Sequence, residues 1–368
     1  MKDSRLEKFA DILVNHSLEL KNNDLFIISA TPVATPLVKE VYIKAVQVGA
    51  HPCIRIGLEG LAEQYYKYAS EKQLKYVSPL SKYEIETVDA RLAIISTENT
   101  KSMTHVDPKK QAVSSTAHQQ IHNIFLQRAA KKELRWCVTQ YPTNAAAQDA
   151  EMSLEEYEEF IFKAGQLYSK NPVAHWQKVS KDQEKIKKML EKKTVLRVVT
   201  KDTDLMVNVK GRKWINCHGK ENFPDGEIFT GPIEKSAQGH ISFSFPAVYG
   251  GREVDDIKLW FENGKVVKNK ASKGEKFLNT MLDMDKGSRY IGEFAFGTNY
   301  GIKTYTKNTL FDEKIGGTIH IAVGSGYPET GSKNISSLHW DMMCDLRKKG
   351  EVYADGELIY KNGKFLTV

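Results

Sequence analysis

The 368-residue sequence contains only four cysteines, Cys53, Cys137, Cys217 and Cys344, and no two of them form a C-x-x-C pair. Scattered cysteines are typical of reduced thiols, and they provide neither a disulfide framework nor a zinc-ribbon motif. Long apolar runs are also missing, so no segment is long enough to span a bilayer as a helix. The N-terminal residues lead into an amphipathic helix without the apolar core of a signal peptide, and we therefore expect a cytoplasmic protein.

The motifs of several common enzyme classes are absent. No G-x-G-x-x-G or G-x-x-x-x-G-K-[ST] segment follows a predicted strand, which argues against a site for a dinucleotide or a nucleoside triphosphate. No G-x-S-x-G elbow is present for a Ser-His-Asp enzyme. The helical pair His118 and His122 lacks the glutamate of an H-E-x-x-H zinc motif, because Gln119 follows the first histidine. We interpret that pair as solvated helix surface.

The composition is that of an ordinary soluble globular protein. Hydrophobic residues make up 41% of the chain and charged residues 27%, and the length suffices for two domains with separate cores. The net charge of +7 arises from 53 basic and 46 acidic residues, with much of the excess in lysine-rich stretches such as 181–193. Basic residues are not interleaved with aromatic residues as in nucleic-acid-binding modules. The sequence therefore predicts neither a nucleic-acid nor a membrane partner.

The first half of the chain alternates helical and strand patterns. Apolar residues recur at helical spacing over 6–18 and 37–48, and short apolar strands are predicted at 24–30 and 52–56. This order is a βαβ unit, which requires a parallel sheet with a right-handed crossover. The pattern continues with a strand, a helix and a strand at 91–96, 108–132 and 134–138.

The second half changes to strands and turns. Helices are predicted over 153–168 and 174–193, the first opened by a capping box. From Val195 onward short strands dominate, and Asn263-Gly264 marks a hairpin turn. We expect a boundary near residue 190, between an N-terminal α/β domain with a parallel sheet and a C-terminal mainly-β (α+β) domain with one helix. The predicted domains are 1–190 and 191–368.

Ionisable side chains stand in apolar strand patterns of the second half. Glu293 and His320 are each surrounded by apolar and small residues along the chain. Because a buried unpaired charge is costly, each must be paired, neutral or bound to a cation. His339 and Asp341 lie two residues apart on a predicted strand and so point to one face. An imidazole and a carboxylate placed in this way can bind a divalent metal such as zinc or manganese.

Glu227 joins this set, because the Pro-Asp-Gly turn before it presents its side chain at a loop edge. Three carboxylates and two imidazoles suit two divalent ions about 3.5–4 Å apart, an arrangement that many hydrolases use. Each residue taken alone has another interpretation. Glu293 can pair with Arg289 or Lys303. Glu227 can cap a turn, and His320 can be a satisfied core histidine.

Seven motifs, in order along the chain, carry a family resemblance, together with the opening helix, the strand at 25–29 and the helix after it. They lie at 142–148 with 152–157, 222–230, 292–293, 308–313, 320–324, 326–328 and 339–341. Over nearly the whole chain, these segments resemble the aminopeptidase T family of metallo-aminopeptidases.

The resemblance implies a homodimeric enzyme that removes N-terminal residues from peptides with a free N-terminus, using two divalent ions. Zinc, cobalt and manganese are all chemically admissible. It also implies Tyr327 as an active-site residue, expected to donate to the developing oxyanion, and we expect Glu293 to accept the proton of the attacking water. The implied metal ligands are Glu227, Glu293, His320, His339 and Asp341.

The stretch between Tyr327 and His339 looks shorter than in typical family members, and it borders the predicted site. Two alternatives therefore stay open. One is a metal-binding relative without peptidase activity. The other is an α/β protein that binds a small ligand at the carboxyl ends of its N-terminal strands. Neither alternative explains why carboxylates and imidazoles recur in apolar strands.

Overall fold

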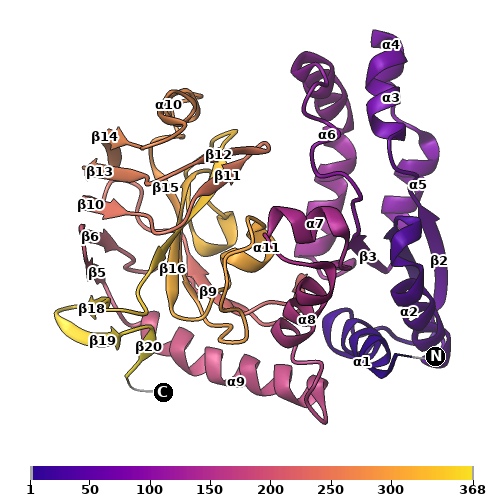
Figure 1. Ribbon diagram of the computed structural model, residues 1–368, viewed down its shortest axis with the longest axis horizontal. Helices are drawn as coiled ribbons and strands as arrows, with labels where there is room; N and C mark the ends of the chain where they lie inside the picture. Colours follow the sequence, from indigo (N-terminus) through magenta and orange to yellow (C-terminus); the bar gives the residue numbers. More distant parts are fainter. Residues whose placement is uncertain (1–2, 367–368) are drawn as a thin grey trace. The chain divides into compact units, whose positions relative to one another are not determined.

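The computed structural model describes residues 3–366 of the chain, which form two units with separate sheets (Figure 1). Within these residues, none of the helices combines the length and the apolar character that crossing a membrane requires. Unit 1 comprises the residues up to 174 together with 219–223, and unit 2 comprises 175–218 and the residues from 224 onward.

Unit 1 is an α/β unit built on a five-stranded sheet of order β2-β1-β3-β4-β8, in which every pairing is parallel. The predicted βαβ unit is confirmed: β1, α2 and β2 follow one another, and α2 buries Leu37, Val41 and Ala45 at intervals of four residues. The strands are β1 (Leu25–Ala30), β2 (His51–Ile56), β3 (Ala90–Ile95), β4 (Arg135–Gln140) and β8 (Asn222–Phe223).

Most helices of unit 1 begin at a residue whose side chain caps them. The predicted capping box opens α8, where the Ser153 hydroxyl accepts from the Glu156 amide and the Glu156 carboxylate accepts from the Ser153 amide. Besides the single π-helical turn η1 (Leu13–Ser17) and the 3-10 turn η2 (Pro32–Ala34), the helices are α1 (Ser4–Ile12), α2 (Thr35–Gln47), α3 (Leu61–Tyr68), α4 (Glu71–Leu74), α5 (Pro79–Thr87), α6 (Pro108–Ala130), α7 (Asn144–Asp149) and α8 (Leu154–Ala164).

Unit 2 is β-rich and antiparallel. One sheet has eight strands in the order β14-β13-β10-β6-β5-β18-β19-β20, and another has five in the order β17-β16-β15-β9-β7. The eight-stranded sheet contains β5 (Val195–Thr200), β6 (Thr203–Asn208), β10 (Gln238–Ser242), β13 (Lys258–Glu262), β14 (Lys265–Lys270), β18 (Glu351–Ala354), β19 (Glu357–Lys361) and β20 (Lys364–Phe365). The five-stranded sheet contains β7 (Ile215–Cys217), β9 (Glu227–Thr230), β15 (Ile291–Gly297), β16 (Thr318–Gly324) and β17 (His339–Asp345).

Unit 2 also contains a hairpin turn, a separate two-stranded sheet and several helices. The predicted hairpin turn joins β13 to β14, and both Asn263 and Gly264 have positive φ, as a type I′ turn requires. The other elements of unit 2 are the two-stranded sheet of β11 (Ala247–Tyr249) and β12 (Arg252–Val254), the helices α9 (Pro172–Leu190), α10 (Glu275–Leu282) and α11 (Thr309–Asp312), and the 3-10 turn η3 (Pro328–Thr330).

Helix α9 belongs almost entirely to unit 2, whereas the sequence analysis placed the domain boundary near residue 190. Ile186 and Leu190 are buried in the apolar core of unit 2, which accounts for this assignment. The sequence pattern marked the end of the helix but could not show on which core its apolar face packs.

One apolar core joins the two large sheets of unit 2. The eight-stranded sheet contributes residues such as Leu196 and Leu259, and the five-stranded sheet contributes Phe294, Ile321 and others. All of these side chains are buried. Because side chains alternate along a strand, packing one face of the five-stranded sheet in this core directs the intervening residues to its other face.

Candidate metal centre

The five predicted ligand residues lie on one face of the five-stranded sheet of unit 2, the face that points away from the apolar core. On β15, Phe294 and Phe296 enter the core, so Glu293 points the other way. On β16, Ile319 and Ile321 enter the core and flank His320. The same alternation directs Glu227 of β9, and His339 and Asp341 of β17, away from Ile228, Trp340 and Met342.

Strand register places a small residue opposite each of these side chains. Glu293 and Asp341 both pair with Ala322, one from each side of β16. Glu227 pairs with Gly297, His320 with Ala295, and His339 with Gly324. Small neighbours leave room above the sheet, so the long ionisable side chains can converge.

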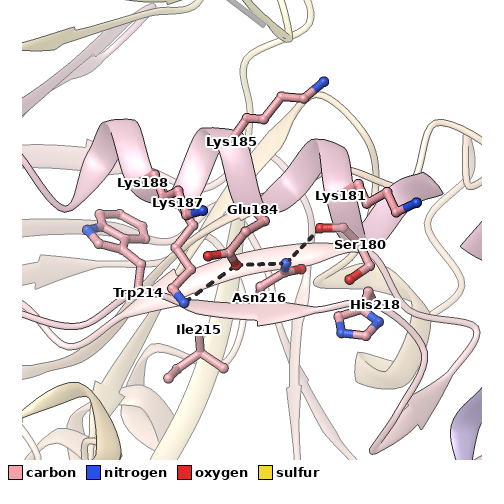
Figure 2. Close-up of a pocket in the computed structure, with 10 residues that line it drawn as sticks. All are labelled: Ser180, Lys181, Glu184, Lys185, Lys187, Lys188, Trp214, Ile215, Asn216 and His218. Carbon is pink, nitrogen blue, oxygen red and sulfur yellow. Dashed lines mark hydrogen bonds and ion pairs between the residues drawn. The ribbon is translucent and has the colours of Figure 1, made fainter. Parts of the chain in front are cut away.

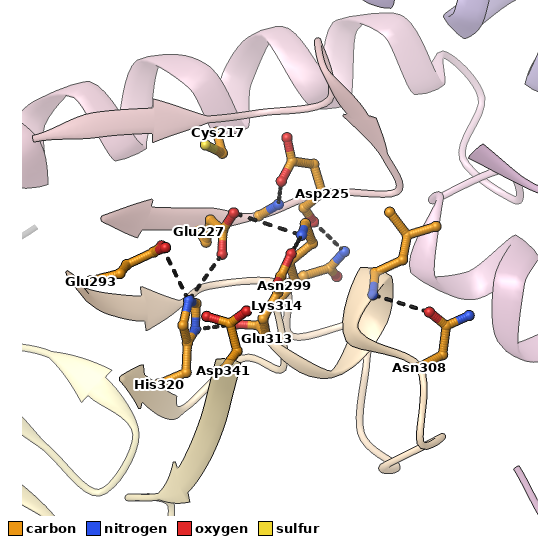
Figure 3. Close-up of polar contacts among 12 residues, drawn as sticks. Cys217, Asp225, Glu227, Glu293, Asn299, Asn308, Glu313, Lys314, His320 and Asp341 are labelled. Carbon is orange, nitrogen blue, oxygen red and sulfur yellow. Dashed lines mark hydrogen bonds and ion pairs between the residues drawn. The ribbon is translucent and has the colours of Figure 1, made fainter. Parts of the chain in front are cut away.

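Distances show this convergence directly. The Nε2 atom of His320 lies 3.4 Å from Glu293 Oε1 and 3.6 Å from Glu227 Oε2. The Nε2 atom of His339 lies 3.4 Å from Glu293 Oε2 and 3.6 Å from Asp341 Oδ2. Glu293 therefore lies between the two imidazoles and directs one oxygen to each. Figure 3 shows Glu227 and Glu293 facing His320.

The residues form two overlapping groups of three. Glu227, Glu293 and His320 form one, Glu293, His339 and Asp341 form the other, and the ligand atoms within each lie within 4.8 Å of one another. Every group of this kind among the described residues lies in unit 2. The alternative prediction was a small-ligand site at the carboxyl ends of the unit 1 strands. None of these groups of potential metal ligands lies there.

Both imidazoles are held in the tautomer that metal binding requires. His320 Nδ1 donates to the backbone carbonyl of Glu313 at 3.0 Å, and His339 Nδ1 donates to that of Ser325 at 2.8 Å. A carbonyl oxygen can only accept, so each Nδ1 carries a proton. The lone pair of each neutral ring is then on Nε2, which faces the carboxylates.

Burial and mutual charge perturb the histidines strongly. Burial lowers the pKa of His320, but its hydrogen bond to Glu293 and the charge of Glu227 outweigh that effect and raise the pKa to about 9. For His339 burial again lowers the pKa, and Asp341 and Glu293 raise it to about 10. In the absence of another cation, the site therefore retains protons on its imidazoles.

The carboxylates respond to the same forces in different ways. Burial raises the pKa of Glu293, but hydrogen bonds from both imidazoles outweigh burial and lower it to about 2. Burial raises the pKa of Asp341 to about 6, against the opposing charge of His339. Burial also raises the pKa of Glu227 well above its usual range. Two buried oxygens, Glu227 Oε2 and Asp341 Oδ1, have no hydrogen-bond partner among the described residues.

This donor set fits divalent metal ions. Buried carboxylate oxygens without a hydrogen bond are costly unless a cation binds them, and both belong to carboxylates beside an imidazole whose Nε2 becomes a metal donor once its proton is displaced. Carboxylate oxygen and imidazole nitrogen are the donors that zinc, cobalt and manganese accept. Arg289, which the sequence analysis considered as a partner of Glu293, instead binds Asp283 at 2.7 Å.

Tyr327 lies at the edge of this centre. Its ring packs against the His339 imidazole at 5.2 Å between centroids, and against Phe229 at 5.1 Å. The side chain remains 39% exposed, so a substrate can reach it. Burial of the phenol and the charge of Glu293 raise the pKa of Tyr327, which keeps the hydroxyl protonated and able to donate.

The sequence analysis missed two charged residues of the centre, Glu313 and Lys314. Glu313 forms a further group of three with His320 and Asp341. The Lys314 side chain is fully buried, and its Nζ pairs with Glu313 and lies 3.6 Å from Glu227 Oε1. Glu313 ends the family motif at 308–313, but adjacent opposite charges in a turn are typical of solvent-exposed surface, so the residue pattern did not mark this pair as buried.

A hollow of about 550 Å³ lies elsewhere in unit 2, between α9 and β7 (Figure 2). Asn216 Nδ2 donates to the Ser180 carbonyl at 2.9 Å, and Lys187 pairs with Glu184 at 3.5 Å. Beside the hollow, Gln183 Nε2 donates to the backbone carbonyl of Glu227 at 2.7 Å. None of the five predicted ligands is among the residues that line this hollow. These hydrogen bonds hold α9 against the edge strand β7, and the bond from Gln183 joins α9 to β9 as well.

The histidine pair of α6 does not join a candidate centre. His118 Nδ1 donates to the Ser114 carbonyl at 2.8 Å, and the ring of His122 stacks on Phe125 at 6.1 Å. Within residues 3–366, no group of potential ligands includes either histidine. Their interpretation as helix surface agrees with these contacts.

Comparisons with known proteins identify the family. The thermophilic metalloprotease (M29) family matches residues 2–365. Aminopeptidase 2 of Geobacillus stearothermophilus is 26% identical, over 99% of this chain and 98% of that protein. Aminopeptidase AmpS of Bacillus subtilis is 27% identical over 98% of both chains. Aminopeptidase T of Thermus thermophilus is 28% identical over 88% of this chain and 85% of that one.

A solved structure agrees in fold. Wild-type AmpT from Thermus thermophilus superimposes with a TM-score of 0.87 at 24% identity, and the match covers 99% of each chain. The two-domain fold class predicted from the sequence, an α/β unit followed by a β-rich unit, is confirmed by this match. The family match over nearly the full length confirms the resemblance as well, and the chain belongs to the M29 family of thermophilic metalloproteases.

Proposed function

We propose that this chain, a metal-dependent aminopeptidase by its family and relatives, binds two divalent ions on the five-stranded sheet of unit 2. The observation that carries the proposal is the position of Glu293, with one oxygen 3.4 Å from each imidazole Nε2. A carboxylate placed in this way would offer one oxygen to each of two ions. The proposed ligands are Glu227, Glu293, His320, His339 and Asp341.

The charge of the site supports two ions. Five carboxylates gather here, and among the described residues the buried ammonium group of Lys314 is the fixed positive charge that faces them. Four negative charges remain, which two divalent ions neutralise. A single ion would leave two buried carboxylates uncompensated, at a cost of roughly several kcal/mol. The five carboxylates are those of Asp225, Glu227, Glu293, Glu313 and Asp341.

Bound divalent ions would supply acidity to a water molecule and polarise the peptide carbonyl. The residues of the chain then complete the reaction. Glu293 is proposed to accept the proton of the attacking water on a lone pair that is not directed at an ion, and to pass it to the leaving amine. The protonated phenol of Tyr327, beside His339, donates to the developing oxyanion. One of the ions, or a carboxylate beside them, would hold the free amino terminus of the substrate, which favours peptides with a free N-terminus.

The finer features follow from the family resemblance and stay proposals. The ions are zinc, cobalt or manganese, since each accepts this mixture of oxygen and nitrogen donors. The active form is a homodimer in the cytoplasm, where the four free cysteines remain reduced. We expect neither a nucleic-acid nor a membrane partner.

The test combines metal content with substrate choice. The purified chain is stripped with a chelator, reloaded separately with zinc, cobalt or manganese, and assayed on an aminoacyl chromogenic substrate and on its N-acetylated analogue. We expect two ions per chain, loss of activity on chelation, recovery on reloading, and no cleavage of the acetylated substrate. Loaded protein that is inactive against a panel of dipeptides would favour a non-peptidase relative. Absence of bound metal would exclude the proposal.

A further inference from the structure

Lys314 places a positive charge inside the carboxylate cluster. Its side chain is fully buried, and its Nζ contacts the Glu313 carboxylate and lies 3.6 Å from Glu227 Oε1 (Figure 3). The negative charge of Asp225 acts on the same ammonium group, so three carboxylates act on it together. A buried lysine with three acidic neighbours stays charged.

The backbone fixes the position of this ammonium group. Lys314 follows the short helix α11, and its amide donates to the Phe311 carbonyl at 3.1 Å. Its carbonyl accepts from the Asn299 amide at 3.0 Å, while Asn299 Nδ2 donates to the Asp225 carbonyl at 2.7 Å. The segment is therefore bonded to the loop that leads into β9, which carries Glu227.

The same segment serves a second ligand. The backbone carbonyl of Glu313 accepts from His320 Nδ1 and so holds that ring with its lone pair on Nε2. Glu313 and Lys314 thus act on His320 and Glu227 from one turn. Since an apolar side chain would be enough to fill this buried space, the charge of Lys314 calls for an explanation.

Glu227 shows the consequence. Its Oε1 faces Lys314, whereas its Oε2 faces His320 Nε2 at 3.6 Å. Glu293 differs, because both of its oxygens face imidazoles. The lysine thus engages one oxygen of Glu227 and leaves the other for the centre.

A second group of potential ligands lies on the lysine side of Glu227. Cys217, Asp225 and Glu227 have ligand atoms within 4.8 Å of one another. A thiol and two carboxylates are suitable donors for zinc or cobalt. An ammonium group beside two of these carboxylates repels a further cation, so the lysine blocks this group electrostatically.

We propose that Lys314 is a positioning residue, a resident cation that limits Glu227 to one donor oxygen and prevents an additional ion from binding at Cys217, Asp225 and Glu227. This inference rests on the proposed two-ion centre. According to this inference, a residue of the protein determines how many ions bind and at which ligands they bind.

The test replaces the charge and counts cobalt. Chelator-stripped wild type, Lys314→Met, Lys314→Arg and Lys314→Met with Cys217→Ser are titrated with Co²⁺, and both bound cobalt and near-ultraviolet absorption are recorded. Wild type and Lys314→Arg are expected to bind two ions without a thiolate-to-cobalt band. Lys314→Met is expected to show that band, which the added Cys217→Ser change removes. Exposed Lys303→Met serves as the matched control and should behave as wild type.

The outcomes separate this inference from the proposed function. If wild type does not bind two ions, the two-ion centre itself fails. If wild type binds two ions and Lys314→Met binds the same number with unchanged affinity and no thiolate band, only the role of Lys314 is overturned. Should Lys314→Met fail to fold, Glu313→Gln with Lys314→Met keeps the net charge of the cluster, and it must show the same band.

Discussion

The two faces of the five-stranded sheet in unit 2 carry opposite chemistry, although the same strands supply both. Phe294 and Ile321 enter a core shared with the eight-stranded sheet, whereas Glu293 and His320, their neighbours in sequence, converge on the other face. Both pairs are buried. One face therefore stabilises the fold by removing apolar surface from water, while the other buries charged groups, which are costly to bury unless they are paired or bound to a cation.

This difference teaches how the fold supports the site. The apolar face fixes the strands rigidly, so the donor atoms of the ionisable face are held at distances of 3.4–3.6 Å before any ion arrives. The cost of that arrangement is visible in Glu227 Oε2 and Asp341 Oδ1, which lack a hydrogen-bond partner within the described residues. Substitutions on the two faces should consequently have separable effects.

The largest expected effect follows from changing the ionisable face. Glu293→Gln and His339→Ala should each lower kcat/KM for an aminoacyl chromogenic substrate by at least about 10³-fold, or ~4 kcal/mol in transition-state energy, because each removes a donor shared by the centre. The circular-dichroism spectrum should stay that of wild type. His118→Ala, on a helix of unit 1, is the control and should keep full activity. Near-normal turnover of either variant would refute the assignment.

The apolar face should respond in stability instead. Phe294→Ala removes a fully buried ring next to Glu293 in sequence, and it should lower the free energy of unfolding by about 3–5 kcal/mol. Below its transition temperature, the variant should still bind two ions per chain. Urea denaturation and metal analysis provide the two readings. A variant of normal stability that has lost its metal would contradict the separation of the two faces.

Metal affinity should depend on pH through the histidines. Without ions, the pKa values of His320 and His339 are raised to about 9 and 10, so both rings are protonated at neutral pH. Since an ion must displace these protons, affinity should rise with pH, by up to about tenfold per pH unit for each proton released. Cobalt titrations at pH 6, 7 and 8 measure the slope. A flat profile would show that the rings do not bind metal.

The stability of the metal-free protein should have the opposite pH dependence. The folded pKa values of both histidines lie above the ordinary value of 6.5, so their stabilising contribution is complete below about pH 6.5. It is lost as the pH rises through 9 to 10. Thermal unfolding of chelated protein across this range should therefore show a falling midpoint, and a rising midpoint would contradict the pairing of the imidazoles with Glu293 and Asp341.

A smaller effect is expected at the rim of the centre. Tyr327→Phe removes one oxyanion donor and should reduce kcat by about 10²-fold with little change in KM. The ring contacts with His339 and Phe229 persist in this variant, so metal content should be unchanged. A loss of metal together with activity would show that Tyr327 supports the ligands and does not act on the substrate.

Much of this arrangement could be predicted from the sequence, because it depends on local periodicity. Alternation along β15 and β16 is legible in the residues themselves, and a lone Glu293 or His320 among apolar neighbours requires a partner. What brings Glu313 and Lys314 to the same centre is the turn after α11, whose path depends on tertiary hydrogen bonds such as that from the Asn299 amide. No periodicity records that path.

The domain division illustrates the same limit. The end of α9 at Leu190 was close to the predicted helix end, yet the helix packs its apolar residues on the core of unit 2. Likewise, residues 219–223, which include β8, belong to unit 1, although the chain on both sides of them belongs to unit 2. Which unit a segment joins depends on the core it can pack against and the sheet edge it can pair with. The spacing of residues along the sequence does not contain that information.

Diffraction from crystals of manganese-loaded protein, recorded for anomalous scattering, tests the central claim most directly. The account predicts two peaks, one among Glu227, Glu293 and His320 and one among Glu293, His339 and Asp341, with Glu293 contacting both. A single peak that leaves Glu293 without metal contact, or no peak on this face of the sheet, would contradict it.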